Sequence, residues 1–280
     1  MAHFSKNKPF VVYTAHGFHF YDGAPLANWI LYYTAERFLA RFTNQLITIN
    51  KEDYERACKF KLAGDGYVDI IPGVGLNPKR YYKKEDINRS MRKELRIPEN
   101  AFHIVSVGEL VANKNHEIII EALHQIANKN IYYSICGKGP YQEHLEQLIH
   151  LYHLENQVHL LGYRTDVEDI LQTADCFAFP SIREGLGMAS VEALACKVPL
   201  VVADNRGTRE YAVDGENSIV CHVDNVEEFK QAINFLMKNP EIRNRMSENA
   251  GHTAENFYLD KTEEKMREIY QRITNILFEA

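Results

Sequence analysis

Short apolar runs alternate with amphipathic stretches along most of the chain. Runs rich in β-branched and aromatic residues are typical of buried strands, and the stretches between them have the spacing of helices. In the first hundred residues, this pattern predicts strands near 10–14, 45–50 and 68–71, with helices near 28–42 and 51–62. A β-α-β-α-β order at these lengths favours a parallel sheet.

The alternation resumes at Phe102, after a stretch broken by glycine and proline that we interpret as a connection between domains. From about residue 226 onward, the pattern predicts three consecutive helices. The pattern predicts strands near 102–107, 131–135, 157–161, 176–179, 198–202 and 218–221, and helices near 115–128, 141–151, 166–173, 188–196, 226–238, 240–256 and 261–278. Six strands with helices between them make a complete doubly wound α/β domain.

The domain predicted from the first hundred residues is less complete than the domain predicted from the rest of the chain. Three strands and two helices make a thin sheet, and small domains bury a low fraction of their surface. The strand near 10–14 has the composition of a central strand, yet only polar residues precede it, so we expect a part of this domain to be missing. We therefore predict an α/β fold with a partial N-terminal domain (1–84), a complete C-terminal domain (85–260) and a final helical segment (261–280).

Composition and charge exclude several classes of protein. The chain is 45% hydrophobic and 25% charged, which excludes a disordered chain. Its net charge of −6 provides no global basic field for nucleic acid. Residues 1–100 hold 16 Lys and Arg against 11 Asp and Glu, whereas residues 101–280 hold 16 against 27. The net positive charge of residues 1–100 has two interpretations. This part of the chain could contact anionic lipid or phosphate, but the more common explanation is a solvated surface.

The cysteines and the N-terminus indicate a cytoplasmic protein. The number of cysteines is odd and no pair has CxxC spacing, which argues against a zinc site or a disulfide framework. They are Cys58, Cys136, Cys176, Cys196 and Cys221. Free thiols suit a reducing compartment. No apolar run approaches the roughly 18 residues that span a bilayer, and the N-terminus has no apolar signal core.

The strongest chemical motif is Pro180–Ala193, which follows an apolar strand and opens a helix. Gly185 and Gly187 allow a ligand to approach the backbone closely, and a helix N-terminus attracts anions. Glu184 and Glu192 bracket this anion site, an arrangement that fits hydroxyl groups on both sides of a diphosphate, as in a sugar nucleotide. The alternative is a plain turn with one exposed and one capping glutamate.

Three weaker motifs lie after other predicted strands. One loop carries Lys114, a suitable phosphate partner, and Asn115 as a candidate N-cap. Gly137 and Gly139 form a GxG pair without the third glycine of a dinucleotide fingerprint. His16 follows the first strand, at the edge where parallel sheets bind ligands. Alone, each is better explained by an ordinary feature: a surface lysine, a tight turn or a loop histidine.

Together these segments resemble the retaining glycosyltransferases of family 4, which have the GT-B architecture of two facing Rossmann-like domains. The resemblance covers the chain from about residue 9 to its end. Within the family, the chain is most similar to bacterial enzymes of capsule, exopolysaccharide and teichuronic-type glycan assembly. It rests on Tyr13–Phe20, Ser106-Val107-Gly108 with Lys114, Gly137-x-Gly139-Pro140, Leu161-Gly162, Pro180-Ser181, Glu184 with Glu192, and Gly207-x-x-Glu210.

The resemblance implies a role for each motif. Lys114 would neutralise the diphosphate, Glu184 would hold the donor sugar, and Glu192 would hold the ribose hydroxyls. His16 would reach the donor sugar from the opposite domain, which makes His16, Glu184 and Lys114 the expected catalytic residues. The expected donor-binding residues are Gly108, Gly137, Gly139, Gly162, Arg164, Gly185, Leu186, Gly187, Met188 and Glu192.

The resemblance also implies the reaction. Such enzymes transfer a sugar from a nucleotide diphosphate sugar with retention at the anomeric carbon, by front-face attack. We expect a UDP-sugar donor, a glycan or lipid-linked acceptor, and no metal cofactor. The protein would lie at the inner face of the membrane, and a basic stretch of the chain would contact the membrane. The basic stretch contains Lys79, Arg80, Lys83, Lys84, Arg89, Arg92, Lys93 and Arg96. The final helix would pack back toward the first domain.

Two departures from the family leave alternatives open. Glu109 stands where many members have arginine. Either Glu109 points away and Lys114 carries the charge, or another cation substitutes, with Arg183 and Arg209 as candidates. The family's N-terminal domain also begins about a hundred residues earlier. The chain could therefore be a non-catalytic donor-binding fragment, or one half of a split enzyme that needs a complementing N-terminal half. A third possibility is a sugar-nucleotide epimerase of the same fold.

Overall fold

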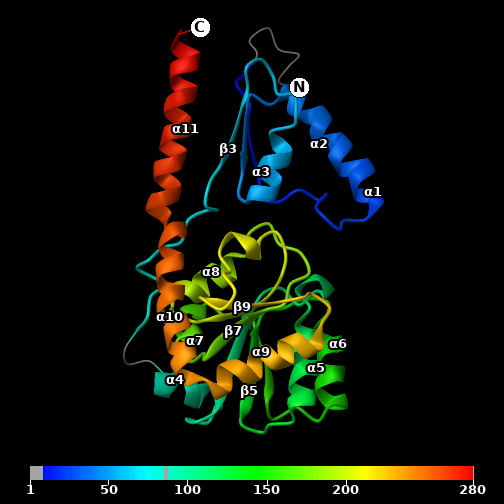
Figure 1. The fold of residues 1–280 in the computed structure, drawn as a ribbon, viewed down its shortest axis with the longest axis vertical. Helices are drawn as coiled ribbons and strands as arrows, with labels where there is room; N and C mark the ends of the chain where they lie inside the picture. Colours follow the sequence, from blue (N-terminus) through cyan, green and yellow to red (C-terminus); the bar gives the residue numbers. More distant parts are fainter. Residues whose placement is uncertain (1–8, 85–87, 280) are drawn as a thin grey trace. The chain divides into compact units, whose positions relative to one another are not determined.

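The computed structural model describes residues 9–84 and 88–279, which form two compact units (Figure 1). One unit contains the chain up to Gly75 together with the residues from Leu259 onward. The other unit is Leu76–Tyr258. Each unit has its own parallel sheet.

The first boundary lies at Gly75 and not after residue 84, because the intervening residues bond to the second unit. The backbone N–H of Lys84 donates to Gln172 Oε1 at 2.9 Å. Gln172 Nε2 in turn donates to the carbonyl of Tyr82 at 2.9 Å. These bonds fix the segment onto a helix of the second unit, so it is not a free linker.

The first unit has a three-stranded parallel sheet in the order β1-β2-β3. The expected helix over 28–42 is present as a continuous helical segment that includes a π-helical turn. The elements are β1 (Val12–Ala15), β2 (Gln45–Thr48), β3 (Tyr67–Ile70), α1 (Leu26–Asn28), η2 (Trp29–Tyr33), α2 (Thr34–Leu39), η3 (Ala40–Phe42), α3 (Lys51–Ala57) and α11 (Leu259–Glu279).

Helix α3 fixes the loop that follows β1. Its N-cap Asn50 accepts a hydrogen bond from the backbone N–H of Asp53 at 2.8 Å. The buried carboxylate of Asp53 accepts from the backbone N–H of Phe18 at 3.1 Å. Phe18 and Phe20 pack in the core of this unit, with ring centroids 4.8 Å apart. The loop that carries His16 is therefore anchored directly after that residue.

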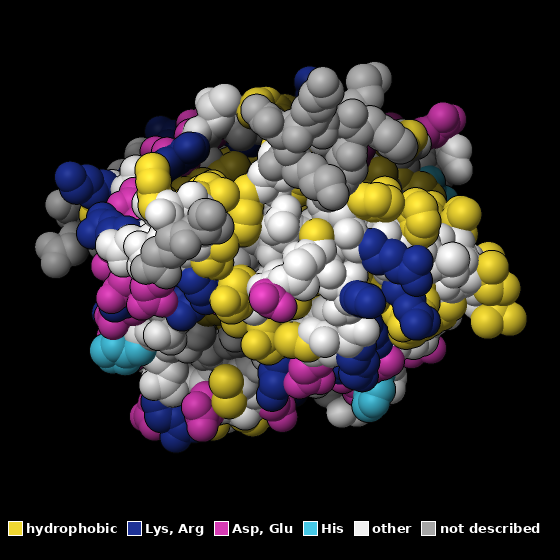
Figure 2. Space-filling model, turned by 90° about the horizontal axis from the view of Figure 1, so that it is seen from above, with side chains coloured by type: hydrophobic (Ala, Val, Ile, Leu, Met, Phe, Trp, Pro, Cys, Tyr) yellow, Lys and Arg dark blue, Asp and Glu magenta, His cyan; other side chains and the backbone are white. Residues whose placement is uncertain are grey.

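The helical segment over 26–42 exposes an apolar surface. Leu26 is 73% exposed and Ile30 is 66% exposed, so these side chains contribute little to the core. Other exposed apolar side chains of this unit include Leu31, Phe38 and Leu39. Figure 2 shows apolar side chains at the surface, in several places beside Lys and Arg. No helix among the described residues is both long enough and apolar enough to cross a membrane.

The second unit has a six-stranded parallel sheet in the order β6-β5-β4-β7-β8-β9, as expected for a doubly wound domain. The strands match the apolar runs of the sequence. They are β4 (Phe102–Val107), β5 (Ile131–Cys136), β6 (Val158–Gly162), β7 (Cys176–Phe179), β8 (Leu200–Ala203) and β9 (Ser218–Cys221). The order reverses between β4 and β7, the point at which such sheets bind ligands.

Helices cover both faces of this sheet (Figure 1). Helix α5 packs against α6 and α9, and α8 packs against α10. The helices are α4 (Asn88–Glu94), α5 (His116–Ile126), α6 (Gln142–Leu151), α7 (Val167–Leu171), α8 (Met188–Ala195), α9 (Val226–Lys238) and α10 (Pro240–Ala254), with short 3-10 turns η4 (Ala112–Lys114), η5 (Thr208–Glu210) and η6 (Glu255–Phe257).

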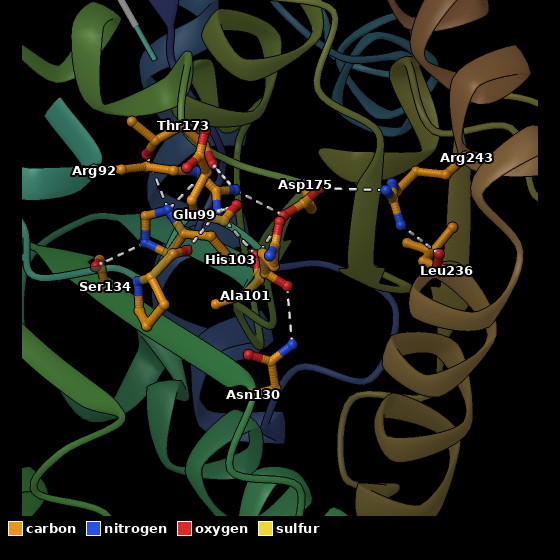
Figure 3. Close-up of polar contacts among 12 residues, drawn as sticks. Arg92, Glu99, Ala101, His103, Asn130, Ser134, Thr173, Asp175, Leu236 and Arg243 are labelled. Carbon is orange, nitrogen blue, oxygen red and sulfur yellow. Dashed lines mark hydrogen bonds and ion pairs between the residues drawn. The ribbon is translucent and has the colours of Figure 1, made fainter. Parts of the chain in front are cut away.

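A buried polar network ties α4 to the sheet and to α10 (Figure 3). Arg92 donates to the carbonyls of Ala101 at 2.9 Å and Thr173 at 2.8 Å. It also donates to Asp175 Oδ2 at 3.0 Å. The other oxygen of Asp175 lies 3.3 Å from Arg243 of α10. Arg92 is thus a structural residue and not part of a basic surface.

Other basic side chains of the stretch over 79–96 also face carboxylates. Arg80 pairs with Glu168 at 3.0 Å, and Lys84 pairs with Asp169. Arg89 pairs with Glu99 at 3.0 Å on the surface. These pairs match part of the positive charge of the stretch, whereas Lys79, Lys83, Lys93 and Arg96 are exposed.

The expected N-cap at Asn115 is wrong. Asn115 has a left-handed backbone (φ 53°), and its side chain makes no capping hydrogen bond to α5. Its Nδ2 instead donates to the carbonyl of Val223 at 2.9 Å. The side chain therefore holds two loops together and leaves the first N–H groups of α5 to other partners.

Replacing Arg92 should destabilise the second unit strongly. The change Arg92→Met leaves buried carbonyls and part of Asp175 without a donor, and we expect a loss of about 3 kcal/mol in the free energy of unfolding. Arg89→Met on the same helix removes only an exposed pair and should cost less than about 0.5 kcal/mol. Urea unfolding of both variants checks this, and equal losses would contradict the structural role of Arg92.

His103 should make the stability pH-dependent. Burial, with a smaller contribution from Arg92, lowers the pKa of His103 to about 3, from an ordinary value of 6.5. The unfolded chain therefore binds a proton below pH 6.5 that the folded chain does not bind. As the pH falls from 6.5 toward 3, the free energy of unfolding should drop by about 1.4 kcal/mol per pH unit for this residue.

The measurement is urea unfolding at several pH values. His103→Gln should remove this contribution to the change of the free energy of unfolding with pH. The matched control is His252→Gln, which replaces an exposed histidine and should keep the contribution of His103. An unchanged slope in His103→Gln would show that this histidine is not the group responsible.

Candidate active site

The candidate site lies at the carboxyl ends of β4 and β7, where the strand order reverses. The loop after β4 leads through η4 to α5, and the loop after β7 leads to α8. Backbone bonds join the two loops: the N–H of Ile182 donates to the carbonyl of Asn113 at 2.8 Å. Asn113 Nδ2 donates to the carbonyl of Arg183 at 3.0 Å. Two motifs far apart in the sequence thus form one site.

Lys114 and Glu184 contact each other across this junction. Lys114 Nζ lies 2.5 Å from Glu184 Oε1, and the side chains are only 20% and 13% exposed. The ammonium group also lies 5.2 Å from the centroid of the Phe179 ring. The structure therefore places a cation and a hydrogen-bond-accepting carboxylate together, at the end of a buried strand.

The loop that carries Glu184 is held from its far side by the segment after β8. Asn205 Nδ2 donates to the carbonyl of Ser181 at 2.9 Å, and Arg206 Nε donates to the carbonyl of Glu184 at 3.2 Å. A Cβ at Gly207 would lie 2.8 Å from Glu184 Cβ, so this glycine lets the segment pack against the loop. The position of Glu184 is thus fixed by its backbone.

Gly187 sets the start of α8. Its φ is +88°, and a Cβ there would lie 2.6 Å from Cε1 of Phe179. Only glycine meets both constraints without strain. The preceding side chain of Leu186 is buried, so Leu186 and Gly185 offer the site backbone groups, and Met188 begins α8. The N–H of Ser190 donates to the carbonyl of Gly187 at 3.0 Å. The first N–H groups of a helix lack i−4 acceptors and suit an anion.

The glycines after β4 and β5 are explained by contact between the two loops. A Cβ at Gly137 would lie 1.8 Å from the carbonyl oxygen of Gly108, and one at Gly139 would lie 2.2 Å from that of Leu110. The loops also share a bond from the N–H of Leu110 to the carbonyl of Lys138 at 3.0 Å. Close backbone packing alone is therefore sufficient to require glycine at these two positions.

A pocket of about 580 Å³ opens between these loops and the start of α7. It contains Gly108, Gly137 and Arg164 from the predicted donor site, whereas Gly139 and Gly162 are not among its lining residues. The lining residues are Val107, Gly108, Glu109, Cys136, Gly137, Lys138, Tyr163, Arg164 and Val167.

Arg164 is bound within the protein. Its Nη2 lies 2.7 Å from Glu94 and 2.6 Å from Asp166. Its hydrogen bonds to Asp166 and Glu94 raise the pKa of the guanidinium above its already high value. Its side chain therefore serves as an ordered wall of the pocket, because its charge is already matched by two carboxylates.

Arg209, one of the candidates for a substitute phosphate cation, pairs with Asp204 at 2.7 Å. Glu109 is exposed at the rim of the pocket. Lys138 is also exposed there, and within the part of the chain that the structure describes it makes no ion pair. The sequence contains this lysine inside the Gly-Lys-Gly turn, but the prediction considered only the two glycines.

Glu192 lies on α8, half-buried, beside a residue that the sequence did not single out. Burial raises the pKa of Glu192, while the nearby Tyr81 and Arg80 counteract that rise. Tyr81 belongs to the segment that the sequence assigned to a connection, which is why its role was missed.

His16 belongs to the first unit. It directly follows β1, and its side chain is exposed. The structure thus brings Lys114 and Glu184 together within the second unit, whereas His16 belongs to the first unit. Among residues 9–84 and 88–279, no group of three or more His, Cys, Asp or Glu side chains is arranged to hold a metal ion.

Known proteins share this sequence and fold. EpsD of Bacillus subtilis (strain 168) is 36% identical over 263 residues, which are 93% of this chain and 69% of EpsD. The UDP-Gal:alpha-D-GlcNAc-diphosphoundecaprenol alpha-1,3-galactosyltransferase of Escherichia coli is 27% identical over 94% of this chain and 69% of its own length.

Among solved structures, Anabaena Alr3699/HepE in complex with UDP matches with a TM-score of 0.84 and 22% identity. The match covers 94% of this chain and 72% of HepE, and it shows that the fold is the α/β fold of GT-B glycosyltransferases. The family profile described as "Glycosyl transferases group 1" matches residues 88–253, which include both loops of the site. The chain therefore belongs to the group 1 glycosyltransferases, a family of transferase enzymes.

Proposed function

We propose that this glycosyltransferase moves a sugar from a UDP-sugar to a lipid-linked glycan acceptor, with retention at the anomeric carbon, in the synthesis of a cell-surface polysaccharide. The observation that carries the donor assignment is the contact of Lys114 with Glu184 beside the start of α8. Support for the substrates comes from relatives: the E. coli enzyme is named for UDP-Gal and a diphosphoundecaprenol acceptor, and HepE binds UDP.

The proposed roles follow from charge and hydrogen bonding. In the reaction, the bond from the anomeric carbon to the diphosphate oxygen breaks and a bond to the acceptor oxygen forms. The acceptor's proton passes to the leaving diphosphate. Lys114 and the N–H groups at the start of α8 stabilise the negative charge that develops there. Because Lys114 and the start of α8 would supply positive charge to the leaving group, we propose that no metal is required.

Glu184 is proposed to bind the donor sugar once Lys114 has turned to the diphosphate. A carboxylate accepts hydrogen bonds from sugar hydroxyls, and its backbone is already fixed by Asn113 and Arg206 through the loop. Glu192 is proposed to accept hydrogen bonds from the ribose, and the 580 Å³ pocket to hold the base. His16 is proposed to contact the donor sugar from the first unit.

Nucleotide binding is the first test of this proposal. A ligand that binds only the folded state at a hundredfold excess over its Kd stabilises the protein by about 2.7 kcal/mol. We expect UDP to raise Tm and Glu192→Ala to abolish the shift. Thermal unfolding with UDP, GDP and ADP measures this, and a folded chain that responds to none of them would contradict the donor assignment.

Transfer activity tests the ion pair. Lys114→Met should lower kcat by about 10² to 10³-fold, because it removes charge stabilisation of the leaving group. Glu184→Ala should lower transfer by a similar factor through the lost sugar contacts. Lys197→Met is a matched control, since Lys197 pairs with Glu248 at 2.5 Å on the surface of the same unit.

The assay follows transfer of radiolabelled sugar to lipid-linked acceptor by product analysis. Normal transfer by Glu184→Ala would overturn the site assignment. Conversion of the donor to an epimer without any acceptor would favour an isomerase of the same fold over a transferase with this substrate pair.

A further inference from the structure

Lys138 lies in a turn after β5 whose backbone is fixed against the loop after β4. The carbonyl of Lys138 accepts a hydrogen bond from the N–H of Leu110 at 3.0 Å, and the N–H of Tyr141 donates to the carbonyl of Leu110 at 2.9 Å. Between them, Gly139 packs so closely that a Cβ there would lie 2.2 Å from the Leu110 carbonyl oxygen. The turn therefore presents the lysine side chain from a defined position at the carboxyl end of β5.

The side chain of Lys138 extends across the end of the neighbouring strand β6. Its Cε lies 3.5 Å from the position that a Cβ would take at Gly162, the last residue of β6. The side chain lines the 580 Å³ pocket, and within the described residues its ammonium group has no ion-pair partner. The pocket thus contains a positive charge that is available to a ligand.

Other donors that line the pocket are already used within the protein. The N–H of Gly108 donates to the carbonyl of Cys136 at 3.0 Å, and the N–H of Gly137 donates to the carbonyl of Gly162 at 2.8 Å. The guanidinium of Arg164 donates to Glu94 at 2.7 Å and to Asp166 at 2.6 Å. A ligand with an acceptor group in this pocket would therefore find its donor in the side chain of Lys138.

The ammonium group of Lys138 lies away from the proposed diphosphate site. The first turn of α8, which receives the diphosphate in the proposed function, follows β7. In the strand order, β6 and β7 are three steps of about 4.8 Å apart, so their ends are separated by about 14 Å. One phosphate cannot contact both places, and Lys138 is thus placed for the part of a nucleotide that is remote from its phosphates.

We propose that Lys138 sets the base specificity of the donor site by donating a hydrogen bond to a carbonyl oxygen of the base, such as the oxygen on C4 of uracil. This inference rests on the proposed function, in which the 580 Å³ pocket holds the base. An ammonium group has three donors and no acceptor. It therefore favours a carbonyl group and disfavours the amino group that cytosine carries at the same carbon, because two donors would then face each other.

UDP and CDP are matched probes for this contact, because they differ only along this edge of the base. Lys138→Met keeps most of the length of the side chain and removes its donors. The affinity for UDP should fall about tenfold, as for one lost hydrogen bond to a charged group, whereas the affinity for CDP should not fall. Lys138→Gln offers an amide oxygen as acceptor, so it should bind CDP more tightly than the wild type does.

Isothermal titration calorimetry of the whole chain with both nucleotides measures these affinities. Lys129→Met is the matched control, since Lys129 is also exposed but directly precedes β5, at the opposite edge of the sheet. It should bind both nucleotides as the wild type does. Thermal unfolding without ligand should give the same Tm for wild type and all three variants, because both lysines are exposed.

The two nucleotides also separate the ways in which the inference can fail. Equal losses of UDP and CDP affinity in Lys138→Met would overturn it, because they would indicate a contact with the phosphates or the ribose. Wild-type affinity for both nucleotides in Lys138→Met would overturn it as well and would leave the proposed function intact. If the wild type binds neither nucleotide, the proposed function fails and the inference fails with it.

Discussion

The contact between Lys114 and Glu184 spans the point where the sheet of the second unit reverses its strand order, and the site depends on it. A parallel sheet brings the carboxyl ends of β4 and β7 side by side, so loops 70 residues apart face each other. At that junction, a half-buried lysine and a half-buried glutamate form an ion pair between the two loops.

The rest of the site is built around this pair by backbone packing. Gly187 lets the chain pass the ring of Phe179 into α8, and Gly137 lets the loop after β5 lie against Gly108. Asn113 bonds the loop that carries Glu184 through its side-chain amide. Because these contacts involve the backbone, the arrangement is preorganised before any ligand binds. In the proposed reaction, the fixed start of α8 would stabilise the leaving diphosphate without a change of backbone, and only the Lys114 side chain would turn from Glu184 when the donor binds.

The sequence predicted features that depend on local pattern and missed those that depend on distant partners. Apolar runs such as the one over 102–107 became strands at the expected positions, and the motif around Glu184 fell at the reversal of the sheet. The burial of Arg92 could not be predicted, because its partners lie up to 83 residues away in the chain. Asn115 likewise bonds a distant loop instead of capping α5, which its local sequence does not reveal.

A crystal structure of the chain with UDP tests the central claim most directly. The account predicts that the diphosphate lies within hydrogen-bond distance of Lys114 Nζ and of the N–H groups at the start of α8. It also predicts that Lys114 has left Glu184 and that the ribose hydroxyls contact Glu192. UDP bound at another place, with the Lys114–Glu184 pair intact, would contradict the account.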